Sequence, residues 1–183
     1  PREATAVFTV NKKYGKDLQA FFSKFEADIK NELKTTEPNL KLALDKEGKP
    51  TSLIDKNTQF NLLNALHGVR HGVYEMSRDI EGLVETSTNL ASVKMKKNNK
   101  IDIVTSQRSS VESAKHDVKE SVASVFRLAD AEVNHSDGYP GWEPNTNSAI
   151  LNVTKTSYEK LFKNEPIVRA IHAGLECGLF LEK

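Results

Sequence analysis

Apolar side chains recur at intervals of three and four residues in four stretches of the chain, a spacing that gathers them on one face of an amphipathic helix. In the first stretch, the apolar stripe begins at Leu18 and ends at Leu33. Each stripe has to be covered by another element, which favours a layered fold. The predicted helices span residues 17–34, 55–66, 109–126 and 150–162.

Runs rich in β-branched and aromatic residues predict strands at residues 4–10, 40–44 and 167–173, and a hairpin of residues 83–95 and 101–107 around the turn KKNNK. Two glycines in residues 67–77 indicate a loop, and prolines and glycines make residues 136–145 irregular. The order of elements shows no strict βαβ repetition. It predicts an α+β fold in which helices pack on one face of an antiparallel sheet.

The second arm of the hairpin carries one candidate binding residue, Arg108. Alternation puts Arg108 on the face opposite to Ile103, and the S-x-x-E spacing of Ser109 and Glu112 predicts a capped helix directly after it. Its guanidinium is thus expected at a sheet edge beside a helix N-terminus. There it either clamps a carboxylate with two hydrogen bonds or forms a surface salt bridge.

Composition sets the protein class. The 183 residues are 38% hydrophobic and 28% charged, with mean hydropathy −0.51, which is typical of a globular protein and excludes a disordered one. A net charge of +1 gives no global field for nucleic acid or an anionic membrane. With one cysteine and no stretch resembling a signal peptide, a cytoplasmic location is expected. Because the chain begins with proline, we also expect it to be part of a longer protein.

The stretch AIHAGLECGLF, residues 170–180, concentrates candidate chemistry near the end of the chain. A strand that ends in a glycine turn would place His172 and Glu176 near a sheet edge, where ligands commonly bind. The alternative is a tightly packed glycine turn without a binding role. Cys177 lacks the surroundings of a nucleophilic cysteine and is interpreted as a small buried residue.

Two histidines, His67 and His71, have the i, i+4 spacing of metal ligands on a helix. The adjacent glycines argue against a helix, and no neighbouring carboxylate completes a ligand set. We interpret them as loop or solvent histidines, and we expect no metal ligand in this chain.

Four stretches together, PREATAVFTV, VETSTNLASV, GYPGWEPNTNSAIL and AIHAGLECGLF, resemble the aminoacyl-histidine dipeptidases, also called Xaa-His dipeptidases or carnosinase-like PepD peptidases. The resemblance covers essentially the whole chain. It departs from the family's pattern at NALHGVRHGVYEMS, which leaves the roles of His67, Arg70 and His71 open.

The resemblance implies a cytoplasmic, zinc-dependent metallopeptidase with a catalytic domain and an inserted lid. Its zinc ligands and general base would lie outside this chain, so the 183 residues alone would be inactive. Residues 1–135 would form a partial lid and dimerisation domain, and residues 136–183 a return segment with a strand and turn of the catalytic domain. The dipeptide's terminal carboxylate would bind Arg108, and His172, Gly174 and Glu176 would line the rim of the site.

The predicted function is therefore that of a dipeptidase segment acting on Xaa-His dipeptides such as carnosine, with substrate contacts, homodimer contacts and no bound cofactor of its own. The alternative is a stand-alone, non-catalytic binding or dimerisation module of the same fold. A third possibility, an independent cysteine or histidine enzyme, would need Cys177 and a histidine in a nucleophile and base geometry.

Overall fold

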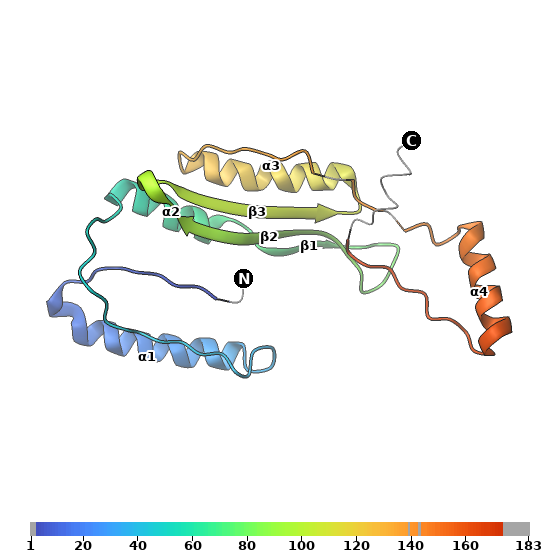
Figure 1. Ribbon diagram of the computed structural model, residues 1–183, viewed down its shortest axis with the longest axis horizontal. Coiled ribbons are helices and arrows are strands. Elements are labelled where there is room, and N and C mark those ends of the chain that lie inside the picture. Colours follow the sequence, from blue (N-terminus) through green and yellow to red (C-terminus); the bar gives the residue numbers. More distant parts are fainter. Residues whose placement is uncertain (1–2, 139, 143, 174–183) are drawn as a thin grey trace. The chain divides into compact units, whose positions relative to one another are not determined.

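The computed structural model describes residues 3–138, 140–142 and 144–173. The chain divides into two compact units, Pro1–Leu53 and Ile54–Lys183. Helices and strands are labelled in Figure 1. The expected boundary between residues 135 and 136 is a different division, based on the family resemblance, and it stays a prediction.

The first unit is built around one long helix. A short 3-10 turn, η1 (Lys12–Tyr14), leads into α1 (Gly15–Glu32), and the Asn11 side chain accepts a hydrogen bond from the backbone N–H of Lys13 at 3.1 Å. Within α1, Leu18 and Phe22 are half-buried, as the apolar stripe predicts, while the rings of Phe21 and Phe25 stack with centroids 6.2 Å apart. The predicted first helix is confirmed.

The two strands predicted in this unit do not form. Residues 4–10 are exposed and have no regular structure, and residues 40–44 alternate between half-buried and exposed positions without pairing to a strand. Because a strand is stable only when its backbone groups find a ladder partner, β propensity alone does not produce one. The alternation at 40–44 reflects burial of one side of an extended segment.

The second unit contains a three-stranded antiparallel sheet, ordered β1 (Gly72–Met76), β2 (Val84–Met95) and β3 (Ile101–Ser109). The helix α2 (Lys56–Gly68) precedes the sheet, η2 (Lys97–Asn99) lies in the hairpin turn, and α3 (Glu112–Leu128) and α4 (Ala149–Phe162) follow. Figure 1 shows α3 running along the β2–β3 hairpin. The predicted α+β class, with an antiparallel sheet and packed helices, is confirmed.

The core lies between this hairpin and the helices. Ala65 and Val69 from the end of α2 join Val122 and Phe126 of α3 in one buried cluster. The sheet contributes the half-buried Leu90 and Ile103. The alternation predicted for the second hairpin arm is confirmed, because Ile103 faces the core and Val104 is exposed. Arg108 therefore lies on the face turned away from α3.

Residues 67–77 were predicted as a loop, and this is wrong. The helix α2 continues to Gly68, and residues 72–76 form the edge strand β1. The Asp55 carboxylate caps α2 by accepting hydrogen bonds from the backbone N–H groups of Asn57 and Thr58, both at 2.9 Å. Gly72, with φ +108°, allows the turn into β1. Gly72 is therefore the first residue of a strand and does not lie in a loop.

The capping box predicted at Ser109 is also wrong, although the helix after it exists. Val111 occupies the N-cap position, and no side chain caps the helix. Ser109 belongs to β3, and its hydroxyl is hydrogen-bonded to Thr86 Oγ1 at 2.8 Å and accepts from Val111 N–H at 3.0 Å. Buried between two strands, the hydroxyl stabilises the sheet and the turn that leaves it.

The last part of the chain differs from expectation in one element. The described residues among 136–145 are irregular, as predicted. The predicted last helix is also present, as α4 (Ala149–Phe162). Lys163, in a left-handed conformation with φ +58°, ends it. Residues 167–173 form no strand. Apolar residues there lack a neighbouring strand to pair with in the part of the chain that the structure describes.

Candidate functional site

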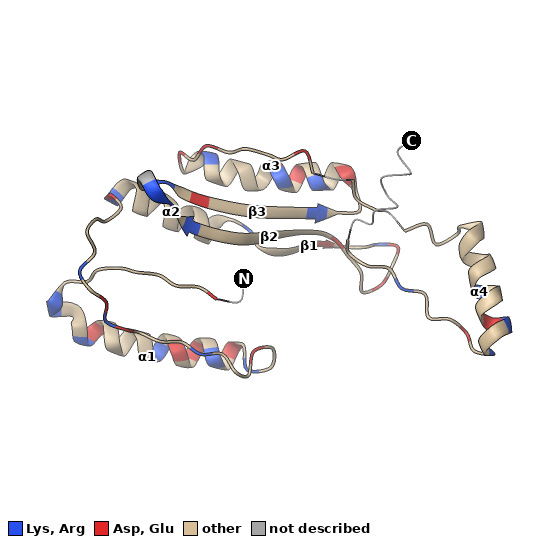
Figure 2. Cartoon of the chain, viewed as in Figure 1, with Lys and Arg blue, Asp and Glu red and all other residues tan. Residues whose placement is uncertain are grey.

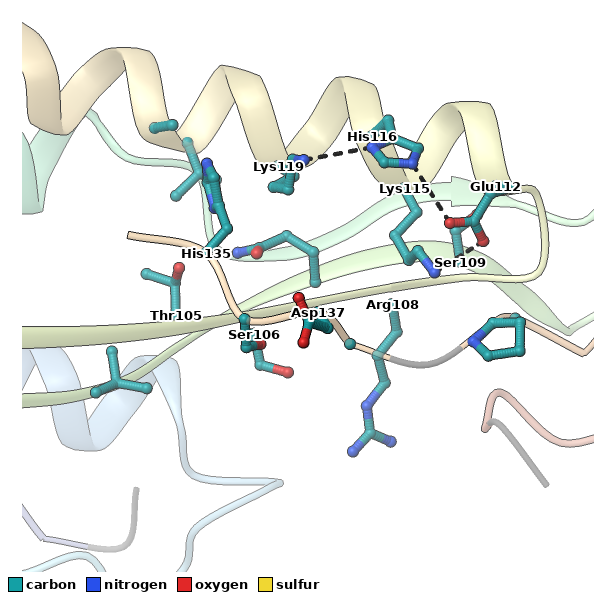
Figure 3. A pocket seen from close by; sticks show the side chains of 18 of the residues that line it. Thr105, Ser106, Arg108, Ser109, Glu112, Lys115, His116, Lys119, His135 and Asp137 are labelled. Atoms are coloured by element: carbon teal, nitrogen blue, oxygen red, sulfur yellow. Dashed lines mark hydrogen bonds and ion pairs between the residues drawn. The ribbon is translucent and has the colours of Figure 1, made fainter. Parts of the chain in front are cut away.

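The outer face of the hairpin brings Arg108 and Ser87 together. The two residues are direct partners in the antiparallel register of β2 and β3, so their side chains project from the same face of the sheet. Figure 3 shows the Arg108 side chain directed away from α3. Within the described residues, Arg108 forms no ion pair with a carboxylate, unlike most charged side chains of the adjacent helix. A guanidinium has five N–H donors and no acceptor, so this side chain, unpaired within those residues, is suited to bind an anion.

The segment after α4 adds His172 to this face. His172 Nε2 lies 2.7 Å from Ser87 Oγ, which is within hydrogen-bonding distance. Burial, and next the positive charge of Arg108, lower the pKa of His172 below its ordinary value of 6.5, although the hydrogen bond to Val84 opposes this shift. The imidazole therefore stays neutral beside the guanidinium at neutral pH.

A cavity of about 650 Å³ runs past this cluster. Its walls are β3, the helix α3 and the irregular segment that follows α3, and Ile171 and His172 also line it. Figure 3 shows His135 and Asp137 of that segment near Thr105 and Ser106 of β3. The cavity has the size of a small-molecule site.

Charges on the helical wall of the cavity are largely paired with one another. Glu112 binds Lys115 at 2.8 Å and lies 3.5 Å from His116, and Glu120 lies 3.0 Å from Arg127 and 3.5 Å from His135. Figure 2 shows acidic and basic residues interspersed along α3. The hydrogen bond and charge of Lys115 contribute most to lowering the pKa of Glu112. Most of the charged side chains of α3 therefore have a partner of opposite charge, whereas Arg108 has none among the described residues.

Gly141 lines the cavity and makes a close backbone contact with Ser109, the residue after Arg108. A Cβ at this position would lie 2.2 Å from the carbonyl oxygen of Ser109 and 3.1 Å from Ser110 Cα. The backbone of Gly141 also donates a hydrogen bond to the Glu112 carboxylate, which helps to lower its pKa. The irregular segment is thereby held against the junction of β3 and α3.

The structure brings together two of the four predicted site residues, Arg108 and His172. Gly174 and Glu176 lie outside the described residues, as does Cys177. Ser87 and Val84 were not predicted, because nothing in their local sequence distinguishes them from other strand residues. Only the hairpin register and the position of His172 reveal them.

The two histidines weighed as metal ligands lie in different elements. His67 is in the last turn of α2, and His71 follows the helix, where its Nδ1 accepts a hydrogen bond from the backbone N–H of Leu90 at 3.0 Å. In the described part of the chain, no group of three or more His, Cys, Asp or Glu residues is arranged to hold a metal ion. Across the same residues, no helix is long and apolar enough to cross a membrane.

Comparison with known proteins relates the chain to dipeptidases, although no protein-family model matches it. The chain is 34% identical over 180 residues to the cytosol non-specific dipeptidase of Escherichia coli, covering 98% of this chain and 37% of that protein. Its fold matches the crystal structure of aminoacylhistidine dipeptidase from Vibrio alginolyticus with a TM-score of 0.87 at 31% identity, over 94% of this chain and 35% of that one.

The chain thus spans little more than a third of the length of these relatives. Both comparisons select a dipeptidase, in agreement with the resemblance carried by the four sequence motifs. The chain is therefore homologous to a segment of these two dipeptidases.

Proposed function

We propose that this chain is the substrate-carboxylate-binding part of a cytoplasmic, zinc-dependent dipeptidase that hydrolyses Xaa-His dipeptides. The observation that carries the proposal is the position of Arg108, an outward-facing cation without a carboxylate partner in the described residues, beside a neutral His172. The dipeptidase names of two homologous proteins support the activity.

Arg108 would bind the C-terminal carboxylate of the dipeptide. A guanidinium presents paired N–H donors that match the two carboxylate oxygens, so it fixes the end of the substrate in orientation as well as in position. His172 excludes water on one side without adding charge. Gly174 and Glu176 would continue the rim of the site, with Glu176 as a partner for the substrate's amino group.

The zinc of this reaction would activate a water molecule and polarise the scissile carbonyl. As the family resemblance implies, we propose that its ligands and the general base lie in other segments of the intact enzyme. In that enzyme, residues 1–135 would belong to the lid and dimerisation domain, and residues 136–183 would return to the catalytic domain.

Substrate preference is the finer part of the proposal. One relative is named a non-specific dipeptidase and the other an aminoacylhistidine dipeptidase. Every dipeptide has a terminal carboxylate, so Arg108 serves either preference equally. Selection of C-terminal histidine would depend on rim residues, and comparing kcat/KM for Xaa-His and other dipeptides on the full-length enzyme distinguishes the two.

The Arg108→Ala variant of the full-length enzyme tests the carboxylate role. Loss of a charge-assisted hydrogen-bonded contact of about 3 kcal/mol lowers kcat/KM for dipeptides roughly 100-fold. Dipeptide amides lack the carboxylate, so their slower hydrolysis should change little. Lys94→Ala is the matched control, since Lys94 is an exposed cation near the other end of the hairpin and pairs in register with Asp102.

Unchanged kcat/KM in Arg108→Ala would show that the carboxylate binds elsewhere. An equal loss for dipeptides and their amides would also contradict the proposal, because it would point to a general effect on the fold. Arg108→Lys is expected to recover only part of the activity, since a lysine ammonium cannot make the paired contact.

A further inference from the structure

The hydroxyl of Ser87 lies where β2 meets the segment that follows α4. Across the ladder it is paired in register with Arg108, and in front of it His172 Nε2 lies 2.7 Å away. Ser87 is half-buried and His172 is half-buried as well, so bulk water competes only partly for this contact. A serine in this position links the arginine-bearing hairpin to a segment 85 residues away in the sequence.

The surroundings of His172 define its protonation. Burial and the positive charge of Arg108 lower the pKa of the ring and favour its neutral form. A neutral imidazole has one nitrogen without a proton, and we assign it as Nε2, which then accepts from the Ser87 hydroxyl at 2.7 Å.

Nε2 of His172 is thus engaged by a side chain of β2. This nitrogen is not available to a substrate group, and the neutral ring serves as a wall beside Arg108. This differs from the rim role expected from the sequence, in which His172 itself contacts the dipeptide.

We propose that Ser87 is a positioning residue that fixes the imidazole of His172 beside Arg108 and so keeps the guanidinium accessible to the substrate carboxylate. The proposal rests on the proposed dipeptidase function and deepens it. Without the hydroxyl, Nε2 loses its donor, and the ring is free to rotate, to change tautomer and to occupy the space of the substrate carboxylate.

The test uses the full-length enzyme with the Ser87→Ala variant. We expect KM for dipeptides to rise about 10-fold with kcat nearly unchanged, because binding of the carboxylate is disturbed and the reacting atoms are not. Ser87→Thr retains a hydroxyl on a strand that favours β-branched residues, and it should restore KM to within about two-fold. Ser92→Ala, in the same strand beyond the bulge, is the control and should leave KM unaltered.

A second readout separates positioning from general stability. The ¹⁵N spectrum of imidazole-labelled enzyme, with His172 assigned through a His172→Asn variant, should show the Nδ1–H tautomer at neutral pH. In Ser87→Ala the Nε2 resonance should shift as the hydrogen bond is lost and tautomers mix. A merely structural role would lower the Tm and leave this resonance in place.

Unchanged KM and an unchanged Nε2 resonance in Ser87→Ala would overturn the positioning role. If Arg108→Ala still lowers kcat/KM selectively for free dipeptides in that case, the proposed function stands and only this inference fails. If neither variant affects dipeptide hydrolysis, the carboxylate site itself is wrong. A parallel fall of kcat and Tm in Ser87→Ala, without a change in KM, would also overturn it.

Discussion

Because Gly141 has no side chain, its backbone can lie directly against the backbone of Ser109 in the wall of the cavity. The Ser109 carbonyl oxygen occupies the space of a Cβ, at 2.2 Å, and both partners of this contact are backbone. A backbone cannot rotate aside as a flexible side chain does. The glycine is therefore required by contact distance, and its φ is not in the left-handed region.

We predict that Gly141→Ala destabilises the protein by about 1–3 kcal/mol, the usual cost of overpacking, and weakens the hydrogen bond from its backbone to Glu112. Thermal and urea unfolding measure the change. Gly48→Ala is the control, because its Cβ would meet nothing within 4 Å. Equal stability of the two variants would show that the segment can move away from β3 without cost.

At the scale of elements, α2 is stabilised by its N-cap residue, Asp55. The Asp55 carboxylate accepts two backbone N–H groups and the Thr58 hydroxyl, the latter at 2.6 Å, and the hydrogen bond from the Thr58 side chain is the main cause of the lowered pKa of Asp55. This helix positions Ala65 and Val69 in the core against α3. Its cap therefore stabilises the layer that supports the hairpin.

We predict that Asp55→Ala lowers the free energy of unfolding by about 1 kcal/mol, because two helix N–H groups lose their acceptor. Asp55→Asn, which retains an acceptor oxygen, should recover most of it. Ser148→Ala removes a longer cap contact, 3.3 Å to Leu151 N, and should cost less. Chemical denaturation followed by circular dichroism compares the three. A larger loss from Ser148→Ala would contradict this ranking of the caps.

At the scale of the whole molecule, the unpaired edges of the sheet are candidate sites for association between two copies of the chain. The family resemblance implies a homodimer, and a strand at residues 167–173 would have added an unpaired edge, but the described structure has no strand there. The outer strands of the sheet are β1 and β3, each paired on one side among the described residues. Such edges are the usual sites of strand pairing between chains.

We propose a homodimer and predict a concentration-dependent sedimentation coefficient for the protein, measured by analytical ultracentrifugation. Because charged residues on an edge strand oppose pairing, Val104→Lys on β3 should weaken association if that edge is used. Val73→Lys makes the matched change on β1. A monomer at every concentration tested would contradict the dimer, and association unaffected by both variants would exclude the sheet edges.

Secondary structure was predicted correctly where the apolar spacing recurs several times within one element. The stripe of α1, the hairpin around KKNNK and the apolar spacing of α3 each involve several residues that agree, so they predict the element whatever its surroundings. The strands at 4–10, 40–44 and 167–173 failed for a common reason. A strand needs a neighbouring strand for its backbone hydrogen bonds, and the local sequence does not indicate whether such a neighbour is present.

The sequence by itself determined the α+β class, the helices, the face on which Arg108 lies and the resemblance to dipeptidases. Only the tertiary structure decided what lies beside Arg108. A bulge between Leu90 and Ser92 shifts the register by one residue, so counting from the turn would place Thr88 opposite Arg108, whereas Ser87 is there. A one-residue shift exchanges the two faces of a strand. The neighbour of Arg108, and the hydrogen bond to His172, therefore depend on backbone geometry that residue types do not encode locally.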